Sequence, residues 1–196
     1  MKKMPIKIIA ICGKSAAGKD TLLQEILKLD RNDIHEIVSC TTRPPREGEI
    51  NGINYHFLTN QEFADKIESG EMLEATVFRD WCYGTSLDSL SSMGVNVGVF
   101  NLDGIDILLD NPKVDLYIVE VYAPDKLRLL RSLNRETNPD VKEIIRRYEA
   151  DEQDFAGFDY AHYRVENLDD TRWMDLRDHA RFILAESGRH WANSAN

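Results

Sequence analysis

Residues 6–21 read IKIIAICGKSAAGKDT, and this stretch decides the fold. The apolar run 6–12 is followed by a turn containing Gly13 and Gly18 and then by the helical pattern 21–27. A buried strand, a glycine-rich turn and a helix in this order are the context of a phosphate-binding loop. The two glycines allow successive amide groups to point at an anion, and the start of the helix adds partial positive charge. The sequence therefore predicts an α/β protein whose first strand leads into a nucleotide phosphate site.

Lys19 ends this loop, where its ammonium group would reach the β- and γ-phosphates of a nucleotide. One position departs from the usual pattern, because Asp20 stands where a serine or threonine normally holds Mg²⁺. Two interpretations stay open: Thr21 supplies the hydroxyl, or Asp20 lies near the metal, directly or through water. A carboxylate beside a triphosphate is unfavourable unless a cation lies between them, which favours an Asp20 that faces the metal or turns outward. We expect ATP to contact the whole loop, namely Gly13, Lys14, Ser15, Ala16, Ala17, Gly18, Lys19, Asp20 and Thr21.

A second segment suited to phosphate is SCTTRPPREGEINGINYHF, residues 39–57. Arg43 and Arg46, flanked by hydroxyl side chains, concentrate donors that match a phosphate monoester. Tyr55 and Phe57 fall on one face of a predicted strand, and the Tyr55 hydroxyl adds a donor. Two phosphate-binding segments in one chain predict a phosphoryl-transfer enzyme with two phosphorylated substrates.

This second segment resembles the signature of the guanylate kinase family. The signature combines a serine, a Thr-Thr-Arg run, a second basic residue, an acid, a glycine and a Tyr-x-aromatic pair at fixed offsets. The matching residues here are Ser39, Thr41, Thr42, Arg43, Arg46, Glu49, Gly52, Tyr55 and Phe57. Cys40 departs from the pattern, since the family usually has serine or threonine there. Downstream, residues 72–74 (MLE) and 83–86 (YGTS) are similar to two further family segments.

The resemblance implies an acceptor site for GMP. Its phosphate would be held by Arg43, Arg46, Tyr55 and Tyr83. Its base would be recognised by Ser39, Glu74, Thr85 or Ser86, and Asp103. In this scheme Glu74 accepts from N1–H and the 2-amino group of guanine, the hydroxyl groups face O6, and Asp103 assists at the 2-amino edge. The chemistry agrees, because adenine would leave the buried carboxylate of Glu74 facing an acceptor.

The helical patterns at 124–133 and 138–151 resemble the family's lid, whose arginines close over the triphosphate. The candidates that would stabilise charge on the transferred group are Arg131, Arg135 and Arg147, with the register between Arg146 and Arg147 left open. Asn167 stands where the family places an asparagine that contacts adenine. Asn101 replaces the first acid of the family's Asp-x-Asp segment. A carboxylate lost at Asn101 and gained at Asp20 would keep the charge near the metal constant.

The resemblance implies an ATP-dependent kinase that phosphorylates GMP or dGMP, with Mg²⁺ as cofactor and no covalent intermediate. Catalysis would rest on positioning and charge neutralisation by Lys19, Arg43 and the lid arginines. Two alternatives are a kinase with a broader range of (deoxy)nucleoside monophosphates, and a non-catalytic module that binds a phosphopeptide. Such modules typically have degenerate phosphate loops, whereas Gly13, Gly18 and Lys19 are all present here.

Alternating apolar strands and helical patterns predict a parallel sheet with helices on both faces. Core strands are expected near 6–12, 35–40, 95–102, 115–122 and 161–166. Residues 39–92 break the alternation and predict an inserted mixed-sheet subdomain, with a helix at 60–68 and a strand at 72–78. A single domain, residues 1–196, would thus comprise a core (1–38, 93–130 and 152–196), a GMP-binding subdomain (39–92) and a lid (131–151). A C-terminal helix is expected at 170–185, packing Trp173, Leu176 and Phe182 on the sheet.

Composition is consistent with a globular kinase. The chain has 196 residues, 42% of them apolar and 30% charged, which allows a sizeable core. A net charge of −10 without a basic stripe argues against nucleic-acid or membrane partners. Cys12, Cys40 and Cys82 lack metal-ligand spacing, which predicts reduced thiols and a cytoplasmic protein. The sequence leaves monomer and homodimer equally open.

Overall fold

The computed structural model describes residues 5–29, 32–46, 48–78, 80–135, 137–168 and 174–194. The chain divides into two compact units. The first unit comprises Met1–Ile8 and Arg31–Leu116, and the second comprises Ile9–Asp30 and Tyr117–Asn196. Among the described residues, none of the helices is both long and apolar enough to cross a membrane.

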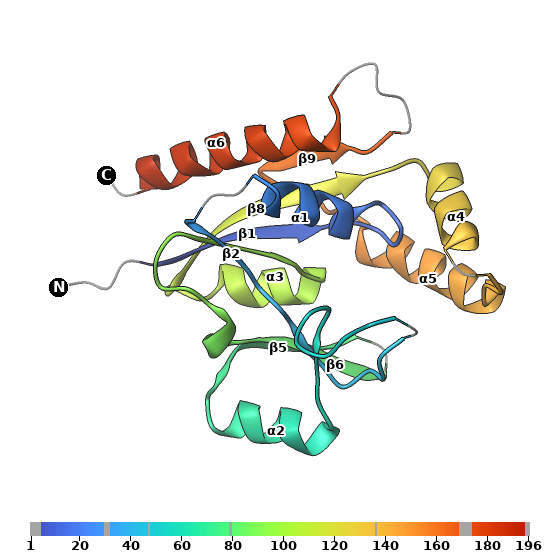
Figure 1. Cartoon of the computed structure of the whole chain (residues 1–196), viewed down its shortest axis with the longest axis horizontal. Helices are drawn as coiled ribbons and strands as arrows, with labels where there is room; N and C mark the ends of the chain where they lie inside the picture. Colours follow the sequence, from blue (N-terminus) through green and yellow to red (C-terminus); the bar gives the residue numbers. More distant parts are fainter. Residues whose placement is uncertain are drawn as a thin grey trace. The chain divides into compact units, whose positions relative to one another are not determined.

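Five strands form the main sheet, in the order β2 (Ile34–Glu36), β7 (Val95–Val99), β1 (Ile6–Cys12), β8 (Val114–Tyr122) and β9 (Tyr163–Glu166) (Figure 1). The β2–β7 and β8–β9 pairs are parallel. Residues 8–12 are fully buried, which accounts for the unbroken apolar run of β1, because strands of a parallel sheet are covered on both faces. The predicted α/β fold with a parallel sheet flanked by helices is confirmed.

The helices of the second unit are α1 (Lys19–Leu27), α4 (Asp125–Asn134), α5 (Val141–Asp154) and α6 (Leu176–Ser194). α1 and α6 lie side by side (Figure 1). α4 and α5 contact each other and correspond to the helical patterns expected at 124–133 and 138–151. α5 begins three residues later than predicted, because the Asp140 side chain caps it by accepting from the Glu143 amide at 3.1 Å.

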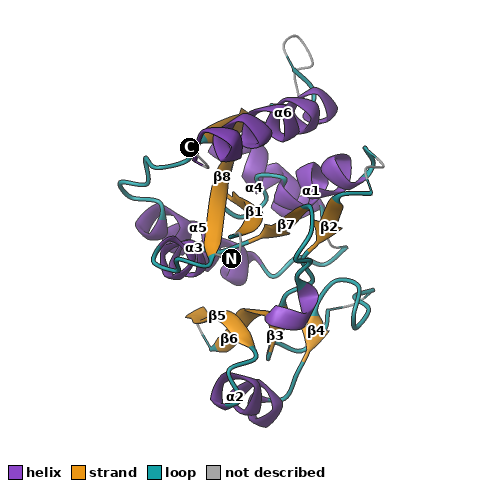
Figure 2. Cartoon of the chain, turned by 90° about the vertical axis from the view of Figure 1, so that its left-hand side faces the viewer, coloured by secondary structure: helices purple, strands orange, loops and turns teal. Residues whose placement is uncertain are grey.

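The first unit contains a second, mixed sheet with α2 (Asn60–Glu68) and α3 (Leu102–Leu109) on opposite sides of it (Figure 2). Its strand order is β4 (His56–Phe57), β3 (Cys40–Thr41), β6 (Trp81–Ser86) and β5 (Met72–Phe78). A short 3-10 helix, η1 (Leu87–Ser89), follows β6 in the chain. β3 runs parallel to β4 and antiparallel to β6, and β5 is antiparallel to β6. A capping box between Thr59 and Glu62 fixes the start of α2. The predicted helix at 60–68 and strand at 72–78 are confirmed.

Three of the predicted strands are too long, including the one expected at 161–166, which begins at Tyr163. The strand predicted at 35–40 is broken, since β2 ends at Glu36 and β3 begins at Cys40. The strand predicted at 95–102 ends at Val99, because the Asn101 side chain accepts from the Gly104 amide at 2.9 Å and so caps α3.

The C-terminal helix is also displaced from its predicted range. α6 begins at Leu176 and continues to Ser194, whereas a helix was expected at 170–185. Its buried side follows the helical repeat through Ile183, Ser187 and Trp191. Phe182 lies off this side and is 40% exposed, but its ring centre is 4.9 Å from that of Tyr163 in β9, so its predicted contact with the sheet is confirmed. Trp173 and residues 170–172 lie outside the described residues.

Candidate active site

The turn between β1 and α1 has the backbone expected of a phosphate loop. Gly13, Ala16 and Gly18 have positive φ angles of 145°, 59° and 105°. A Cβ on Gly13 would lie 2.3 Å from the Val121 carbonyl oxygen, and one on Gly18 would lie 2.1 Å from Nδ2 of Asn167. Both glycines are therefore required by torsion, and Gly13 also by its close approach to the backbone of Val121. Left-handed torsions interleaved with right-handed ones produce the concave run of amides that binds anions.

Lys19 folds back over this loop. Its Nζ donates to the carbonyl oxygens of Gly13 at 2.7 Å and Lys14 at 3.2 Å. Burial lowers the pKa of Lys19, while the carboxylates of Asp20 and Asp151 act in the opposite direction. The ammonium group thus lies in the loop, with weak carbonyl partners that an anionic phosphate would replace.

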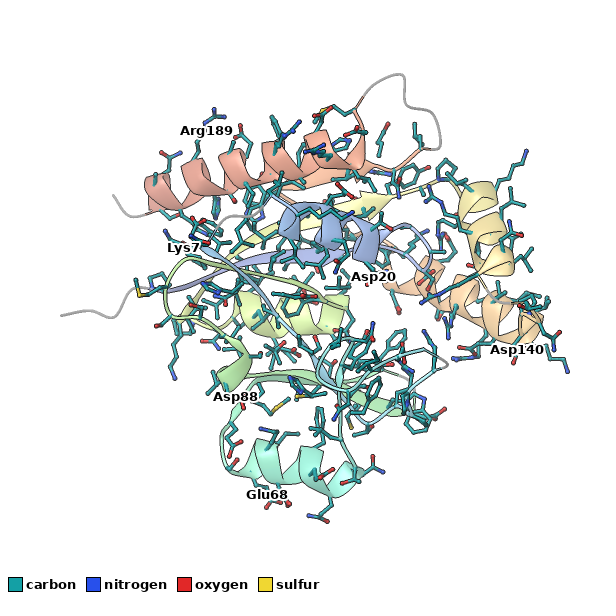
Figure 3. The ribbon with its side chains drawn as sticks, in the orientation of Figure 1. Lys7, Asp20, Glu68, Asp88, Asp140 and Arg189 are labelled. Carbon is teal, nitrogen blue, oxygen red and sulfur yellow. The ribbon has the colours of Figure 1, made fainter. Side chains whose placement is uncertain are left out.

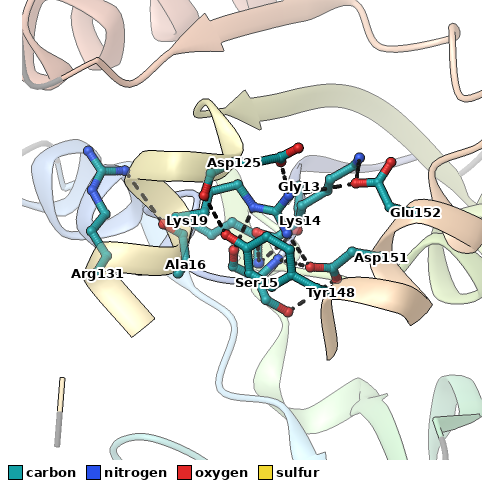
Figure 4. Close-up of polar contacts among 11 residues, drawn as sticks. Gly13, Lys14, Ser15, Ala16, Lys19, Asp125, Arg131, Tyr148, Asp151 and Glu152 are labelled. Atoms are coloured by element: carbon teal, nitrogen blue, oxygen red, sulfur yellow. Dashed lines mark hydrogen bonds and ion pairs between the residues drawn. The ribbon is translucent and has the colours of Figure 1, made fainter. Parts of the chain in front are cut away.

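Two acids of α5 bind the same loop. Asp151, which is 6% exposed, accepts from the Ser15 amide at 2.8 Å and from the Ser15 hydroxyl at 3.1 Å (Figure 4). Glu152 forms an ion pair with Lys14. Acidic side chains therefore occupy donors of two consecutive loop residues.

Arg128 of α4 completes this cluster with a side chain that is 1% exposed. Its guanidinium group lies 4.4 Å from the centre of the Tyr148 ring. It donates to the Ser15 carbonyl at 2.9 Å, to Asp125 at 2.7 Å and to Asp151 at 2.5 Å. We did not predict Arg128 or Asp151, because each lies in an ordinary charged helix pattern that carries no local signal.

The predicted donor-side residues fall into two groups. Arg131 donates to the carbonyl oxygens of Ala17 and Asn167, each at 3.2 Å, and the Asn167 amide donates to Ala17 at 2.7 Å. Both therefore lie against the loop. Arg135 is exposed, and Arg147 pairs with Glu143 on the same helix at 2.8 Å. Arg146 binds Glu143 as well, so the register between Arg146 and Arg147 stays open.

Asp20 and Thr21 are the candidate Mg²⁺ ligands. Both are exposed in the first turn of α1, and Figure 3 shows Asp20 at the start of this helix. A carboxylate and a hydroxyl at the end of a phosphate loop are the oxygen donors that Mg²⁺ accepts together with substrate phosphates and water. The residues present fit the ion, and either of them can contribute the protein ligand.

In the first unit, Arg43 lies within an aromatic and acidic cluster. Its guanidinium group is 5.4 Å from the centre of the Tyr55 ring and donates to Glu49 at 3.0 Å. Glu49 also accepts from the Arg46 amide at 2.7 Å. The rings of Tyr55 and Tyr83 are 6.2 Å apart. The residues predicted to hold the acceptor phosphate therefore gather in one place.

Glu74 is buried in the same small sheet, with 6% exposure. The register of β5 and β6 pairs it with Thr85, whose hydroxyl donates to Glu74 at 2.8 Å. Burial raises the pKa of Glu74 to about 7. Ser86 follows Thr85 in the strand and so faces the other side of the sheet, where its hydroxyl donates to the Glu71 carbonyl at 3.4 Å. Of the two predicted hydroxyls, Thr85 is the one that adjoins Glu74.

Asn101 also lies beside Glu74. Its amide nitrogen donates to the Thr76 hydroxyl at 2.9 Å, while its oxygen caps Gly104. A Cβ on Gly104 would lie 2.8 Å from the Asn101 oxygen and 3.3 Å from Oε2 of Glu74. Asp103, predicted to assist at the base, is exposed in the first turn of α3. We expected Asn101 near the metal and did not predict its place beside Glu74, although an asparagine three residues before a helical glycine is a capping signal.

Ser39, the other hydroxyl expected near O6, precedes β3 and is half-buried. Its carbonyl oxygen accepts from the His56 amide at 2.9 Å. Through this bond the chain at Ser39 extends the pairing of β3 with β4.

Comparison with known proteins agrees with the geometry. Residues 5–178 match the family model for guanylate kinase. The guanylate kinase of Campylobacter jejuni is 36% identical over 121 residues, which cover 61% of this chain and 59% of that protein. The guanylate kinase of Malacoplasma penetrans is 32% identical over 149 residues, covering 72% of this chain and 76% of that protein. The matched part of this chain thus spans less than two thirds of the Campylobacter protein.

The fold has a counterpart among solved structures. The crystal structure of guanylate kinase from Anaplasma phagocytophilum aligns with a TM-score of 0.66. The alignment covers 94% of this chain and 88% of that chain at 19% sequence identity. At this identity the likeness shows a shared fold.

Proposed function

The chain belongs to the guanylate kinase family, and we propose that it transfers the γ-phosphoryl group of ATP to GMP or dGMP with Mg²⁺ as cofactor. The observation that carries this proposal is the buried Glu74 carboxylate, which has one side-chain partner, Thr85, among its described hydrogen bonds. The phosphate loop from Gly13 to Lys19 supports it from the donor side.

Glu74 supplies the base selection in this proposal. Guanine presents N1–H and the 2-amino group side by side, and one carboxylate can accept from both. Adenine presents an acceptor at N1, so its binding would leave the buried carboxylate unpaired. Asn101, beside Glu74, would border the same edge of the base.

Phosphoryl transfer needs charge neutralisation and alignment, and the chain's own residues divide these tasks. Lys19 would exchange its carbonyl partners for the β- and γ-phosphates. Arg43, Arg46, Tyr55 and Tyr83 would hold the acceptor phosphate. Arg131 already lies at the loop, and Arg135 and Arg147 would join it from the lid when water is excluded. Asp20 or Thr21 would hold Mg²⁺, which would supply charge neutralisation for the transfer.

We propose three functional parts within the chain. Residues 39–92 would bind the acceptor nucleotide, residues 131–151 would form the lid, and residues 1–38, 93–130 and 152–196 would form the core. The cysteines described as free thiols, Cys12, Cys40 and Cys82, support a cytoplasmic location in the proposal.

The test is an ADP-release assay with Mg·ATP and GMP, dGMP, AMP, CMP, UMP or dTMP as acceptor. We expect turnover with GMP and dGMP alone, and its loss in Glu74→Gln. Glu71→Gln is the matched control, because Glu71 is an exposed acid of the same sheet region that pairs with Lys66. Turnover with several bases would favour a broad-range kinase. A folded wild-type protein without turnover would favour the binding module.

A further inference from the structure

Asp151 is bound by the phosphate loop as an anionic ligand would be. One carboxylate accepts from the Ser15 amide, from the Ser15 hydroxyl and from Arg128. A backbone amide, a hydroxyl and a guanidinium group converging on one oxyanion are the donor set that proteins use for phosphate. Asp151 therefore satisfies donors that a polyphosphate would otherwise take.

The position of Asp151 is unfavourable apart from these contacts. It lies in the last turn of α5, where the helix dipole disfavours negative charge, and Glu152 follows it. Its carboxylate acts on Lys19, because Asp151 is among the charges that raise the pKa of that lysine against the effect of burial. A buried acid with these neighbours is held in place by its partners at the loop.

Arg128 connects the elements around Asp151. Its side chain is 1% exposed and bridges α4, the loop and α5 through Asp125, Ser15 and Asp151. A buried guanidinium group that lost Asp151 would need another anion. Phosphate oxygens are equivalent partners for it, because guanidinium binds carboxylate and phosphate with the same fork of donors.

On the basis of the proposed ATP-binding role of the loop, we propose that Asp151 is a resident substitute for nucleotide phosphate. In the nucleotide-free protein its carboxylate holds the Ser15 donors, and an arriving polyphosphate displaces it and takes over Arg128. Asp151 then acts as a competitor that sets donor affinity, and the guanidinium group of Arg128 passes from the protein carboxylate to the ligand.

The alternative is a permanent clasp in which Asp151 stays on Ser15 when the loop is filled. The two cases predict opposite effects of neutralising Asp151. If Asp151 competes with the ligand, weakening its bonds to the loop should raise ligand affinity. If Asp151 stays on Ser15, weakening these bonds should leave the loop less well positioned and lower ligand affinity.

The experiment is calorimetric titration of Asp151→Asn and wild-type protein with inorganic tripolyphosphate and with ATP, both in EDTA. An amide in place of a carboxylate keeps the shape but weakens the charge-assisted bonds, so we expect about 10-fold tighter binding of both ligands. Equal or weaker binding in Asp151→Asn would overturn the proposal. Binding in the variant but not in wild type would support it, and binding in neither would overturn it.

Glu152→Gln is the matched control, because it removes one charge from the adjacent residue of the same helix, whose carboxylate pairs with Lys14 and lies 3.9 Å from Arg128. We expect a smaller gain in tripolyphosphate affinity than in Asp151→Asn, since the Glu152 side chain is 57% exposed. An equal gain in both variants would show a general charge effect and overturn the specific role of Asp151.

A measurement on wild-type protein covers the case in which Asp151→Asn does not fold. The carboxyl carbon signal of Asp151 and the amide signal of Ser15 are followed by NMR during titration with tripolyphosphate. Both are expected to move together to new positions at saturation. An unmoved Asp151 carboxyl signal at saturation would overturn the proposal. The proposed kinase activity fails separately, through absent GMP-dependent ADP release, so the two failures are distinguishable.

Discussion

Of the described residues, two acids are buried, Asp151 beside the phosphate loop and Glu74 in the small sheet, and their environments contrast. Asp151 is saturated by a guanidinium group, an amide and a hydroxyl. Glu74 has one hydroxyl partner, Thr85, and burial raises its pKa to about 7. Burial alone therefore does not mark a ligand site. A saturated carboxylate is already serving as a ligand of the protein, whereas a buried carboxylate with few donors is prepared to accept them from outside.

The largest effect is expected at Lys19, because its substitution should impair catalysis at the phosphate loop while leaving GMP binding nearly unchanged. Lys19→Met removes the ammonium group from the phosphate loop and should lower kcat by roughly 10³-fold or more. Because GMP is proposed to bind residues of the first unit, its affinity should change little. Steady-state kinetics and GMP titration of the same preparation measure both quantities. A large loss of GMP affinity would break the division of roles.

The next largest effect is expected for the free energy of unfolding, and it tests whether Arg128 neutralises the buried carboxylate of Asp151. Arg128→Met should lower the free energy of unfolding by about 3–5 kcal/mol, because it leaves the carboxylate of Asp151 buried without its cation. Urea denaturation measures this loss. Arg128→Met combined with Asp151→Leu should recover much of it, since the unpaired charge is gone. If the double variant is as unstable as the sum of both single variants, the ion pair is not the coupled unit that the structure indicates.

The free energy of unfolding should depend on pH, because the buried Glu74 has few hydrogen-bond donors. Its pKa is raised by burial from 4.5 to about 7 in the folded protein, so the folded state binds more protons than the unfolded state between these values. Stability should therefore fall as pH rises from 4.5 to 7, by about 3 kcal/mol from this group, and stay low above that. Denaturation curves of wild type and Glu74→Gln across this range isolate the contribution. Identical pH profiles would show that Glu74 is not strained by burial.

Glu74 should also make GMP binding depend on pH, because its carboxyl group loses a proton when GMP binds. Guanine donors favour the ionised form of Glu74, so GMP affinity should rise with pH up to about 7 and binding should release protons below it. Titration calorimetry in buffers of different ionisation enthalpy measures the protons released. Glu74→Gln should abolish this component.

The fold was largely predictable, and the reasons lie in local patterns. The apolar run of β1 followed by Gly13 and Gly18 predicts a buried strand and a turn with positive φ angles. The start of α2 is marked in the sequence by its capping box. The end of β7 was missed because the Asn101 cap interrupts a continuing apolar pattern. In the site, the resemblance located Glu74 and Arg43, whereas the Arg128–Asp151 pair joins residues 23 positions apart in charged helices. Contacts of this kind arise from tertiary packing, which periodicity does not encode.

The smallest effect is expected for GMP affinity when the neighbouring hydroxyl groups of Thr85 and Ser86 are removed in turn. Thr85→Val removes the one side-chain donor described for Glu74, which should raise the pKa of Glu74 further and weaken GMP binding at pH 7 by about 10-fold. Ser86→Ala should change GMP affinity by less than about 3-fold, because the Ser86 hydroxyl bonds the Glu71 carbonyl on the opposite face. GMP titration of both variants gives the ratio directly. An equal or larger loss in Ser86→Ala would place the base against the other face of β6, and Glu74 would then no longer account for the choice of guanine.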